Sequence, residues 1–324
     1  MKNEFPETLQ EAIQHFSNED IAFDFIRTMR WKDGVAECPH CGSQKSYSLG
    51  VRGTWKCKEC KKKYSVRAGT IFEDSPIALG KWMGAFWLIV NAKNGISSYE
   101  ISRALGVTQK TGWFMLSRIR LAMQSGSIMK MRGNVEVDET FIGAKARNMH
   151  ANKRRERVKG RGAVAMTPVQ GLLQRKHGKK KCSQVVVMPV SGRTKTILQS
   201  NVRDLVAKGS NVYTDELLSY GGLNDEFTHK VINHAECYAK GHVHTNGLEN
   251  FWSLLKRSIK GTYVNVEPFH LFRYLDEQAF RFNERKDEDG DKGRFLKAIA
   301  GIIGKRLTWA ELTGKNVQAD ALPA

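Results

Sequence analysis

Four cysteines near the start of the chain constrain its folding more than any other feature. Cys38 and Cys41 form one C-x2-C pair, and Cys57 and Cys60 form a second pair after fifteen intervening residues. Two residues between cysteines allow a tight turn that directs both thiolates at one ion. Four thiolates close a tetrahedron around Zn²⁺ and leave no open position, so the spacing predicts a structural zinc site. Redox pairs and disulfides are the alternatives, and a reducing compartment argues against disulfides.

The segment between the two cysteine pairs is expected to form a short hairpin. A module of this size has too small a core to fold alone, so zinc binding would supply the missing free energy. Lysines cluster around the second pair, and we expect them to contact DNA. These residues are Lys56, Lys58, Lys61, Lys62 and Lys63.

Composition places the chain among ordinary globular proteins. Its 324 residues suggest about two domains with a small added module. A hydrophobic content of 41% and a charged content of 26% exclude bulk disorder and coiled coil. The longest apolar stretch, residues 82–90, is far too short for a membrane span. The start of the chain is polar and acidic, unlike a secretory signal, so we expect a cytoplasmic protein without a membrane partner.

The formal net charge of +19 is concentrated in two windows. Residues 45–67 carry a net +7 and residues 144–181 a net +12, so the rest of the chain is balanced. Basic patches of this kind attract a polyanion by displacing its counterions, which favours nucleic acid over a merely solvated loop. In the second window we expect DNA contacts from Lys153, Arg154, Arg155 and Arg157.

Residues 97–124 have the pattern of a helix-turn-helix. Serine caps a short helix over 99–105, Gly106 makes a turn, and Thr108 caps a longer helix to about residue 124. A plain three-helix packing unit is the alternative. The expected DNA contacts along the second helix are Thr108, Gln109, Lys110, Arg118 and Arg120.

From residue 134 onward the pattern changes to short β-rich runs followed by helices. Strands are expected over 135–142, 163–173, 184–190, 211–214 and 230–233, and helices over 194–208, 246–260 and 268–285. This order predicts an α/β domain built on a mixed sheet.

Three acidic residues stand out in this region. Asp138 lies in the first strand, Asp215 ends a later strand, and Glu249 lies in a helix. Carboxylates at such positions face the crevice where α/β domains place their sites, although isolated acids are commonly solvated surface. Together they could hold two divalent cations, Mg²⁺ first and Mn²⁺ as a substitute, which suits phosphodiester chemistry. Lys256 lies two turns after Glu249 on the same helix face, and the neighbouring Arg257 is a candidate contact to DNA phosphate.

Several sequence blocks together resemble those of a known family. The chain looks like bacterial insertion-sequence transposases with an N-terminal zinc ribbon and a DDE catalytic domain. The features that carry this resemblance are residues 244–257 (HTNGLENFWSLLKR) and 259–263 (IKGTY), the blocks at 137–140, 213–216 and 272–278, and the four-cysteine ribbon. The resemblance implies a ribonuclease-H-like fold, cleavage of double-stranded DNA at terminal inverted repeats, and transfer of the freed 3′ ends into target DNA.

The resemblance also implies residue roles. Asp138 and Asp215 take the two aspartate positions, Glu249 the third, and Lys256 that of the associated basic residue. Some members carry asparagine at the third position, and Asn246 and Asn250 flank Glu249. A carboxylate binds a divalent cation better than a neutral amide, which favours Glu249.

The expected organisation is a multidomain α/β protein. It comprises an N-terminal helical segment (1–34), a zinc ribbon (35–70), a helix-turn-helix region (75–128), a ribonuclease-H-like catalytic domain (132–286) and a C-terminal tail (287–324). Joining two ends requires more than one protomer, so we expect a homo-oligomer on DNA. A non-catalytic DNA-binding regulator and a metal-dependent nuclease that never joins ends are the alternative functions.

Overall fold

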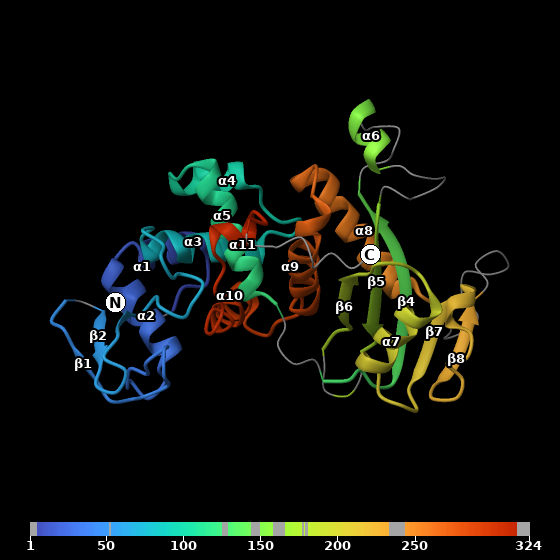
Figure 1. The fold of residues 1–324 in the computed structure, drawn as a ribbon, viewed down its shortest axis with the longest axis horizontal. Coiled ribbons are helices and arrows are strands. Elements are labelled where there is room, and N and C mark those ends of the chain that lie inside the picture. Colours follow the sequence, from blue (N-terminus) through green and yellow to red (C-terminus); the bar gives the residue numbers. More distant parts are fainter. Residues whose placement is uncertain are drawn as a thin grey trace. The chain divides into compact units, whose positions relative to one another are not determined.

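The computed structural model describes residues 5–51, 53–124, 129–143, 150–157, 166–176, 178, 181–232 and 244–315 (Figure 1). The chain divides into two units, each with its own core. The first unit comprises Met1–Gln124 and Asp287–Ala321, and the second comprises Ser125–Lys286 and Leu322–Ala324. Among the described residues, every helix is too short or too polar to traverse a lipid bilayer.

The first unit begins with two helices and a small antiparallel sheet. Its elements are α1 (Leu9–Phe16), α2 (Glu19–Arg30), β1 (Ser46–Ser48), β2 (Thr54–Cys57) and β3 (Lys63–Ser65), with strand order β1-β2-β3. The sequence predicted an N-terminal helical segment (1–34) and the hairpin, and the structure forms two helices, α1 and α2, in that segment. A capping box at Thr8 starts α1, because the Thr8 hydroxyl accepts from the Glu11 N–H while the Glu11 carboxylate accepts from the Thr8 N–H.

Three further helices follow the ribbon, and the second and third have the order of short helix, turn and longer helix that the sequence predicted. They are α3 (Leu79–Asn91), α4 (Ser98–Leu105) and α5 (Gln109–Ala122). Ser97 caps α4 through the N–H of Glu100, and Thr108 caps α5 through the N–H of Thr111. Between these helices Gly106 has φ 60°, a left-handed conformation that glycine adopts without strain. The turn therefore ends α4 and redirects the chain into α5.

The segment after residue 286 packs into the first unit. Its helices are α10 (Gly290–Ala300) and α11 (Trp309–Leu312). Phe295 is fully buried, with its ring centroid 5.9 Å from Phe25 and 5.1 Å from Trp87. The expectation of a C-terminal tail is therefore wrong for residues 287–315. The overlooked signal was the helical spacing of Phe295, Ala298, Ile299 and Ile302, all of which are buried.

A five-stranded mixed sheet forms the centre of the second unit, with strand order β6-β5-β4-β7-β8. The strands are β4 (Asn134–Ile142), β5 (Thr167–Gln174), β6 (Gln184–Pro189), β7 (Asn211–Asp215) and β8 (Thr228–Ile232). β4, β5 and β6 pair antiparallel, whereas β4, β7 and β8 pair parallel. This confirms the predicted mixed α/β sheet and is consistent with a ribonuclease-H-like fold.

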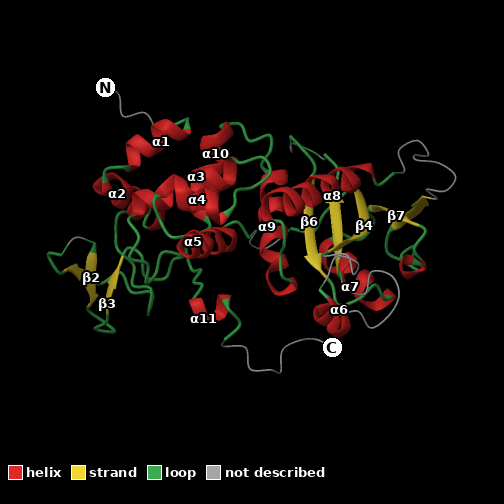
Figure 2. Cartoon of the chain, turned by 90° about the horizontal axis from the view of Figure 1, so that it is seen from above, coloured by secondary structure: helices red, strands yellow, loops and turns green. Residues whose placement is uncertain are grey.

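Helices cover both faces of this sheet (Figure 2). One face packs on α7 (Lys195–Leu205), and the other packs on α8 (Asn246–Ser258) and α9 (Leu271–Asn283). The remaining helical elements are α6 (Ala151–Arg157), η2 (Leu218–Tyr220), the π-helical turn η3 (Ile259–Tyr263) and η4 (Pro268–His270). Because side chains alternate along β4, each of its residues faces either the α7 layer or the α8 layer.

Replacing Phe295 with alanine tests whether α10 is part of the first unit's core. A fully buried phenylalanine that loses its ring leaves a cavity, so Phe295→Ala should lower the free energy of unfolding of this unit by about 3–5 kcal/mol in urea titrations. The matched control is Tyr99→Ala, which removes an aromatic ring that is 65% exposed and should cost less than about 0.5 kcal/mol. Equal effects of the two substitutions would contradict the packing of α10.

Candidate active site and zinc centre

The four cysteine sulfurs of the ribbon converge on one point. All four Sγ atoms lie within 4.8 Å of one another, and the Cys38–Cys60 and Cys41–Cys57 Sγ pairs are both 3.6 Å apart. Thiolates at about 2.3 Å from a tetrahedral zinc ion lie about 3.8 Å apart, whereas a disulfide requires about 2.05 Å. The spacing therefore fits a Zn²⁺ ion and excludes disulfides among these four residues, which confirms the predicted zinc ribbon.

Backbone geometry prepares the second pair for metal binding. Burial raises the pKa of the Cys57 thiol, but the backbone N–H groups of Cys60 and Glu59 act in the opposite direction and bring it to about 6. The thiolate is the form that binds metal, so this turn favours the ligand state near neutral pH. Around it, Lys58, Lys61, Lys62 and Lys63 are exposed and Lys56 is half-buried on β2, so all of the predicted DNA-contacting lysines retain access to solvent.

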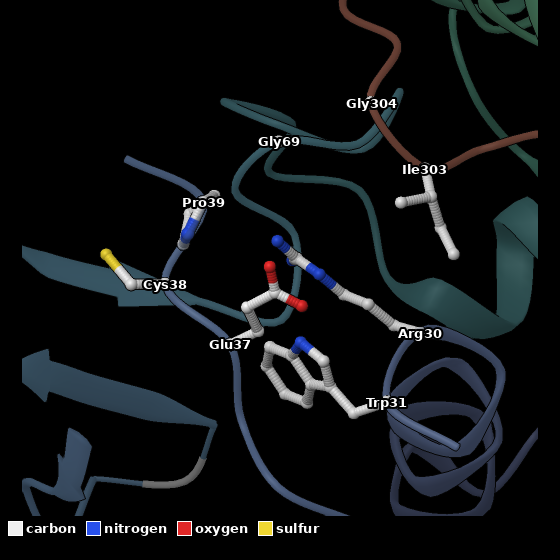
Figure 3. Close-up of a pocket in the computed structure, with 8 residues that line it drawn as sticks. All are labelled: Arg30, Trp31, Glu37, Cys38, Pro39, Gly69, Ile303 and Gly304. Atoms are coloured by element: carbon white, nitrogen blue, oxygen red, sulfur yellow. The ribbon is translucent and has the colours of Figure 1, made fainter. Parts of the chain in front are cut away.

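A small pocket lies beside the first cysteine pair, within the first unit. Its volume is about 200 Å³, and it is lined by Arg30, Trp31, Glu37, Cys38, Pro39, Gly69, Ile303 and Gly304. Figure 3 shows the Arg30 guanidinium next to the Glu37 carboxylate, near the Trp31 indole. The N–H of Gly304 donates to the carbonyl of Gly69 across 2.9 Å. The pocket thus lies where the C-terminal segment packs against the ribbon. The three predicted catalytic acids are not among its lining residues.

The first turn of α5 keeps its predicted DNA-contacting residues at the surface. Thr108 and Lys110 are exposed, and the Lys110 ammonium lies 4.5 Å from the ring centre of Trp309. Gln109 is half-buried because its amide donates to the Ser98 hydroxyl across 2.8 Å. DNA contact by these three residues stays a prediction.

Arg118 and Arg120, in contrast, do not face solvent, and their assignment as DNA contacts is wrong. Their exposed fractions are 4% and 1%. The Arg118 guanidinium donates to the carbonyls of Leu307, Ile71 and Glu73 at 2.8–3.0 Å. These acceptors come from segments far apart in the sequence, so the helical pattern of α5 alone could not reveal them.

Part of the second basic window lies on α6. Arg154 and Arg155 are exposed there, while the side chains of Lys153 and Arg157 lie outside the described part of the chain. The contribution of this window to DNA binding stays a prediction.

The pairing of β4 with β7 aligns the two predicted catalytic aspartates. Glu136 is level with Tyr213 in this parallel ladder, and the same register continued by two residues sets Asp138 level with Asp215. Adjacent strands are about 4.8 Å apart, and residues at one level point to the same side of the sheet. Val135 and Val212 face the α7 layer, so the alternation turns Asp138 and Asp215 toward the α8 layer.

Glu249 reaches this face from α8. The apolar side of α8 is buried against the sheet, as the sequence predicted, while Glu249 and Lys256 are half-buried and Arg257 is exposed. Burial raises the pKa of Asp138, and the negative charges of Asp215 and Glu249 raise it further, against hydrogen bonds from Trp252 and the N–H of Glu139. The negative charges of the other two predicted acids therefore both influence the Asp138 carboxylate.

Glu139 adds a fourth carboxylate on the opposite side of β4. Burial first, and then the charges of Asp138 and Asp215, raise its pKa to about 8, while Arg193 opposes the shift. The Tyr220 hydroxyl donates a hydrogen bond to Glu139. Glu139 lies in the sequence block at 137–140. Its neighbours Arg193 and Tyr220 come from later segments, so the local sequence could not predict their contacts with Glu139.

The chemistry of the acidic centre suits a hard divalent cation, although its oxygens are not drawn together. Among the described residues, only the four cysteines form a group of three or more potential ligands with all ligand atoms within 4.8 Å. Carboxylate oxygens are the ligands that Mg²⁺ prefers, and each oxygen offers two lone pairs. Asp138 uses one lone pair on each oxygen, accepting from the Glu139 N–H at 2.8 Å and from the Trp252 indole at 2.9 Å.

Two family models match the segments that carry these sites. A transposase zinc-ribbon domain matches residues 17–63, and an ISXO2-like transposase domain matches residues 130–283. The chain therefore carries a transposase zinc-ribbon domain followed by an ISXO2-like transposase domain. The resemblance to insertion-sequence transposases found in the sequence is thereby confirmed.

A protein of Halobacterium salinarum, described as an uncharacterized protein in transposable element ISH50, is 28% identical to this chain over 257 residues. The aligned region covers 76% of this chain and 84% of that protein. The similarity therefore extends over most of the length of both chains.

Removal of zinc should unfold the ribbon of the transposase. Purified protein should contain one zinc per chain, and Cys57→Ser should lose it because three thiolates and a hydroxyl bind zinc far more weakly. The Trp31 and Trp55 rings, 4.9 Å apart at their centroids, should then change their near-ultraviolet circular dichroism. Cys182→Ser removes a buried thiol of the second unit and should keep one zinc. Retention of zinc by Cys57→Ser would contradict the four-thiolate site.

Arg118→Met tests the structural role of this buried cation. The substitution leaves the carbonyl groups of Leu307, Ile71 and Glu73 without their donor, in two buried hydrogen bonds and one that is partly buried, so the first unit should lose about 3 kcal/mol or more of unfolding free energy. Arg103→Met, at an exposed position of α4, should change it by less than about 0.5 kcal/mol. An Arg118→Met protein of unchanged stability with weakened DNA binding would restore the DNA-contact assignment.

Proposed function

We propose that this transposase cuts double-stranded DNA at the terminal inverted repeats of its element and joins the freed 3′ ends to target DNA. The observation that carries the proposal is the parallel pairing of β4 with β7, whose register, continued by two residues, sets Asp138 level with Asp215 on the sheet face that α8 covers. Glu249 on α8 contributes to the raised pKa of Asp138, which is what a third acid near the same centre would do. Crowded like charges of this kind are typical of a site that holds cations.

Asp138, Asp215 and Glu249 would hold Mg²⁺, with Mn²⁺ as a substitute. When bound, the cations supply activation of the attacking oxygen and stabilisation of the leaving oxygen of the phosphodiester. The three carboxylates would supply the charge that attracts the cations. Hydrogen bonds from Trp252 and Glu139 orient the Asp138 carboxylate.

Glu249 is the better candidate for the third ligand than its asparagine neighbours. Asn246 and Asn250 are exposed, whereas Glu249 is half-buried and interacts electrostatically with Asp138. Lys256 lies two turns further along α8 and is also half-buried, so its ammonium can meet a phosphate that approaches the acids. Arg257 is exposed and can hold a phosphate further along the DNA.

DNA recognition would fall mainly to the first unit. The exposed lysines of the zinc ribbon supply phosphate contacts, and the first turn of α5, with Thr108 and Lys110 at the surface, supplies contacts to base edges. We assign the ribbon to residues 35–70, the helix-turn-helix to 75–128 and the catalytic domain to 132–286. Since two element ends must be held together for joining, the working form on DNA would be a homo-oligomer.

Substituting either aspartate should abolish the chemistry without preventing DNA binding. Asp138→Asn and Asp215→Asn keep the side-chain shape but remove a negative ligand, so cleavage and joining of end-bearing DNA in Mg²⁺ should fall by about 10³-fold or more. Glu249→Gln should behave in the same way, whereas Asn250→Ala should be nearly unaffected. Gel-based cleavage and strand-transfer assays measure both steps, and a mobility-shift assay measures end binding.

The control is Glu216→Gln, which removes an exposed acid next to Asp215 and should leave both reactions unchanged. Joining by Asp138→Asn at the wild-type rate would refute the assigned site. Cleavage without joining by the wild-type protein would instead favour a nuclease, and binding without either reaction would favour a regulator.

A further inference from the structure

Two hydrogen bonds join α8 to β4 on the face that carries the acids. Glu136 and Asp138 are two residues apart on β4 and therefore point to the same side of the sheet. The carboxylate of Glu136 accepts from the Leu248 N–H at 3.0 Å, and that of Asp138 accepts from the Trp252 indole Nε1–H at 2.9 Å. The helix that carries Glu249 is thus attached to the strand that carries Asp138 at two points.

The Trp252 indole occupies a space that exists because residue 171 is glycine. Gly171 on β5 lies directly opposite Asp138 in the antiparallel ladder. A Cβ atom at Gly171 would lie only 2.6 Å from Cζ2 of Trp252, which is closer than such contacts allow. Trp252 is 4% exposed, so its indole is enclosed in this gap with little freedom to move. The gap sets the indole N–H beside the Asp138 carboxylate, on the side of β4 away from β7.

Glu136 provides the second attachment at the start of α8. Its side chain is 1% exposed and also accepts from Arg175 Nε at 2.7 Å, while Arg175 Nη2 donates to the carbonyl of His244 at 2.7 Å. A Cβ atom at Gly247 would lie 2.7 Å from Oε2 of Glu136, so the helix backbone passes very close to this carboxylate. This network holds the residues that lead into α8 as well as its first turn.

The spacing of the two attachments matches the geometry of both elements. Leu248 and Trp252 are four residues apart on a helix, or about 6 Å, and Glu136 and Asp138 are two residues apart on a strand, or about 6.8 Å. Glu249 lies between the two attachment points. A helix displaced by one residue would break both hydrogen bonds together.

We propose that Trp252 is a positioning residue that fixes the Asp138 carboxylate for cation binding, with Gly171 providing its space and Glu136 setting the register of α8. This inference rests on the proposed function, since it takes Asp138 as a cation ligand. Trp252 Nε1 holds one oxygen of Asp138 and the Glu139 N–H holds the other, so the plane of the carboxylate is fixed and a lone pair on each oxygen remains for a cation. Such partners of metal ligands commonly change metal affinity by about 10- to 100-fold.

A first experiment detects the contact without catalysis. In protein labelled with ¹⁵N-tryptophan, the indole N–H resonance that disappears in Trp252→Phe is that of Trp252. Asp138→Asn should shift this resonance, because the carboxylate that accepts its hydrogen bond has lost its charge, whereas Glu216→Gln should not. A Trp252 resonance that is insensitive to Asp138→Asn would overturn the proposed contact.

A second experiment measures its consequence for the cation. Trp252→Phe keeps a ring in the gap but loses the N–H donor, so Mn²⁺ binding to the zinc-loaded protein, followed by electron paramagnetic resonance, should weaken about tenfold or more. The melting temperature should change by only a few degrees. In an Asp138→Asn background the same substitution should cause no further loss of Mn²⁺ affinity, an outcome that a purely structural role would not produce. Wild-type Mn²⁺ affinity in Trp252→Phe would overturn the proposal.

A substitute variant covers the case in which Trp252→Phe is poorly folded. Gly171→Ala displaces the indole without removing it, and it should weaken Mn²⁺ binding and shift the Trp252 resonance. The two hypotheses also fail in different ways. If the wild-type protein neither cuts nor joins DNA, the proposed function is wrong, and if Asp138→Asn still cuts and joins DNA, the assignment of Asp138 as a cation ligand is wrong. If Asp138→Asn is inactive but Trp252→Phe binds Mn²⁺ and cuts like the wild type, only the positioning role is wrong.

Discussion

The parallel pairing of β4 with β7 is the constraint on which the acidic centre depends. Parallel strands require a long crossover, so Asp138 and Asp215 are far apart along the chain and become neighbours only when the register of this ladder is correct. A shift of one residue would turn one aspartate to the α7 face. The apolar residues that alternate with the acids, Val135 and Val137 on β4 and Val212 on β7, fix that register by burial. The hydrophobic core of the second unit therefore determines the geometry of its polar site.

Different interactions stabilise the ribbon and the helical part of the first unit. The ribbon has short strands and little core of its own, and four converging thiolates hold its turns together around zinc. The helical part of the first unit instead closes around buried aromatic residues, including Phe295, which follows the ISXO2-like transposase domain in the chain. The first unit is thus formed by two segments of the chain, and most of the second unit lies between them in the sequence. The buried contacts of Arg118 with the carbonyl of Leu307 are part of this closure.

Much of the architecture could be predicted from local patterns, and the exceptions share a physical cause. The cysteine spacing, the caps at Ser97 and Thr108 and the alternation along β4 are short-range signals, and each gave the correct element. Arg118 has the sequence context of a surface residue, and only contacts with distant carbonyls account for its burial. The helix that carries Trp252 was predicted, but the hydrogen bond from Trp252 to Asp138 depends on how α8 lies on the sheet. Helical periodicity does not contain that information.

Three acids that are distant in sequence are proposed to surround one cation site. Localised oxidative cleavage measures this directly: Fe²⁺ replaces Mg²⁺ in the folded protein, ascorbate and peroxide generate radicals at the bound ion, and mass spectrometry maps the cut positions in the polypeptide. A shared cation site predicts cuts near all three of residues 138, 215 and 249. Excess Mg²⁺ should suppress these cuts, and they should be absent from Asp138→Asn. Cuts that fall at only one of these positions, or that persist in Asp138→Asn, would contradict a shared site.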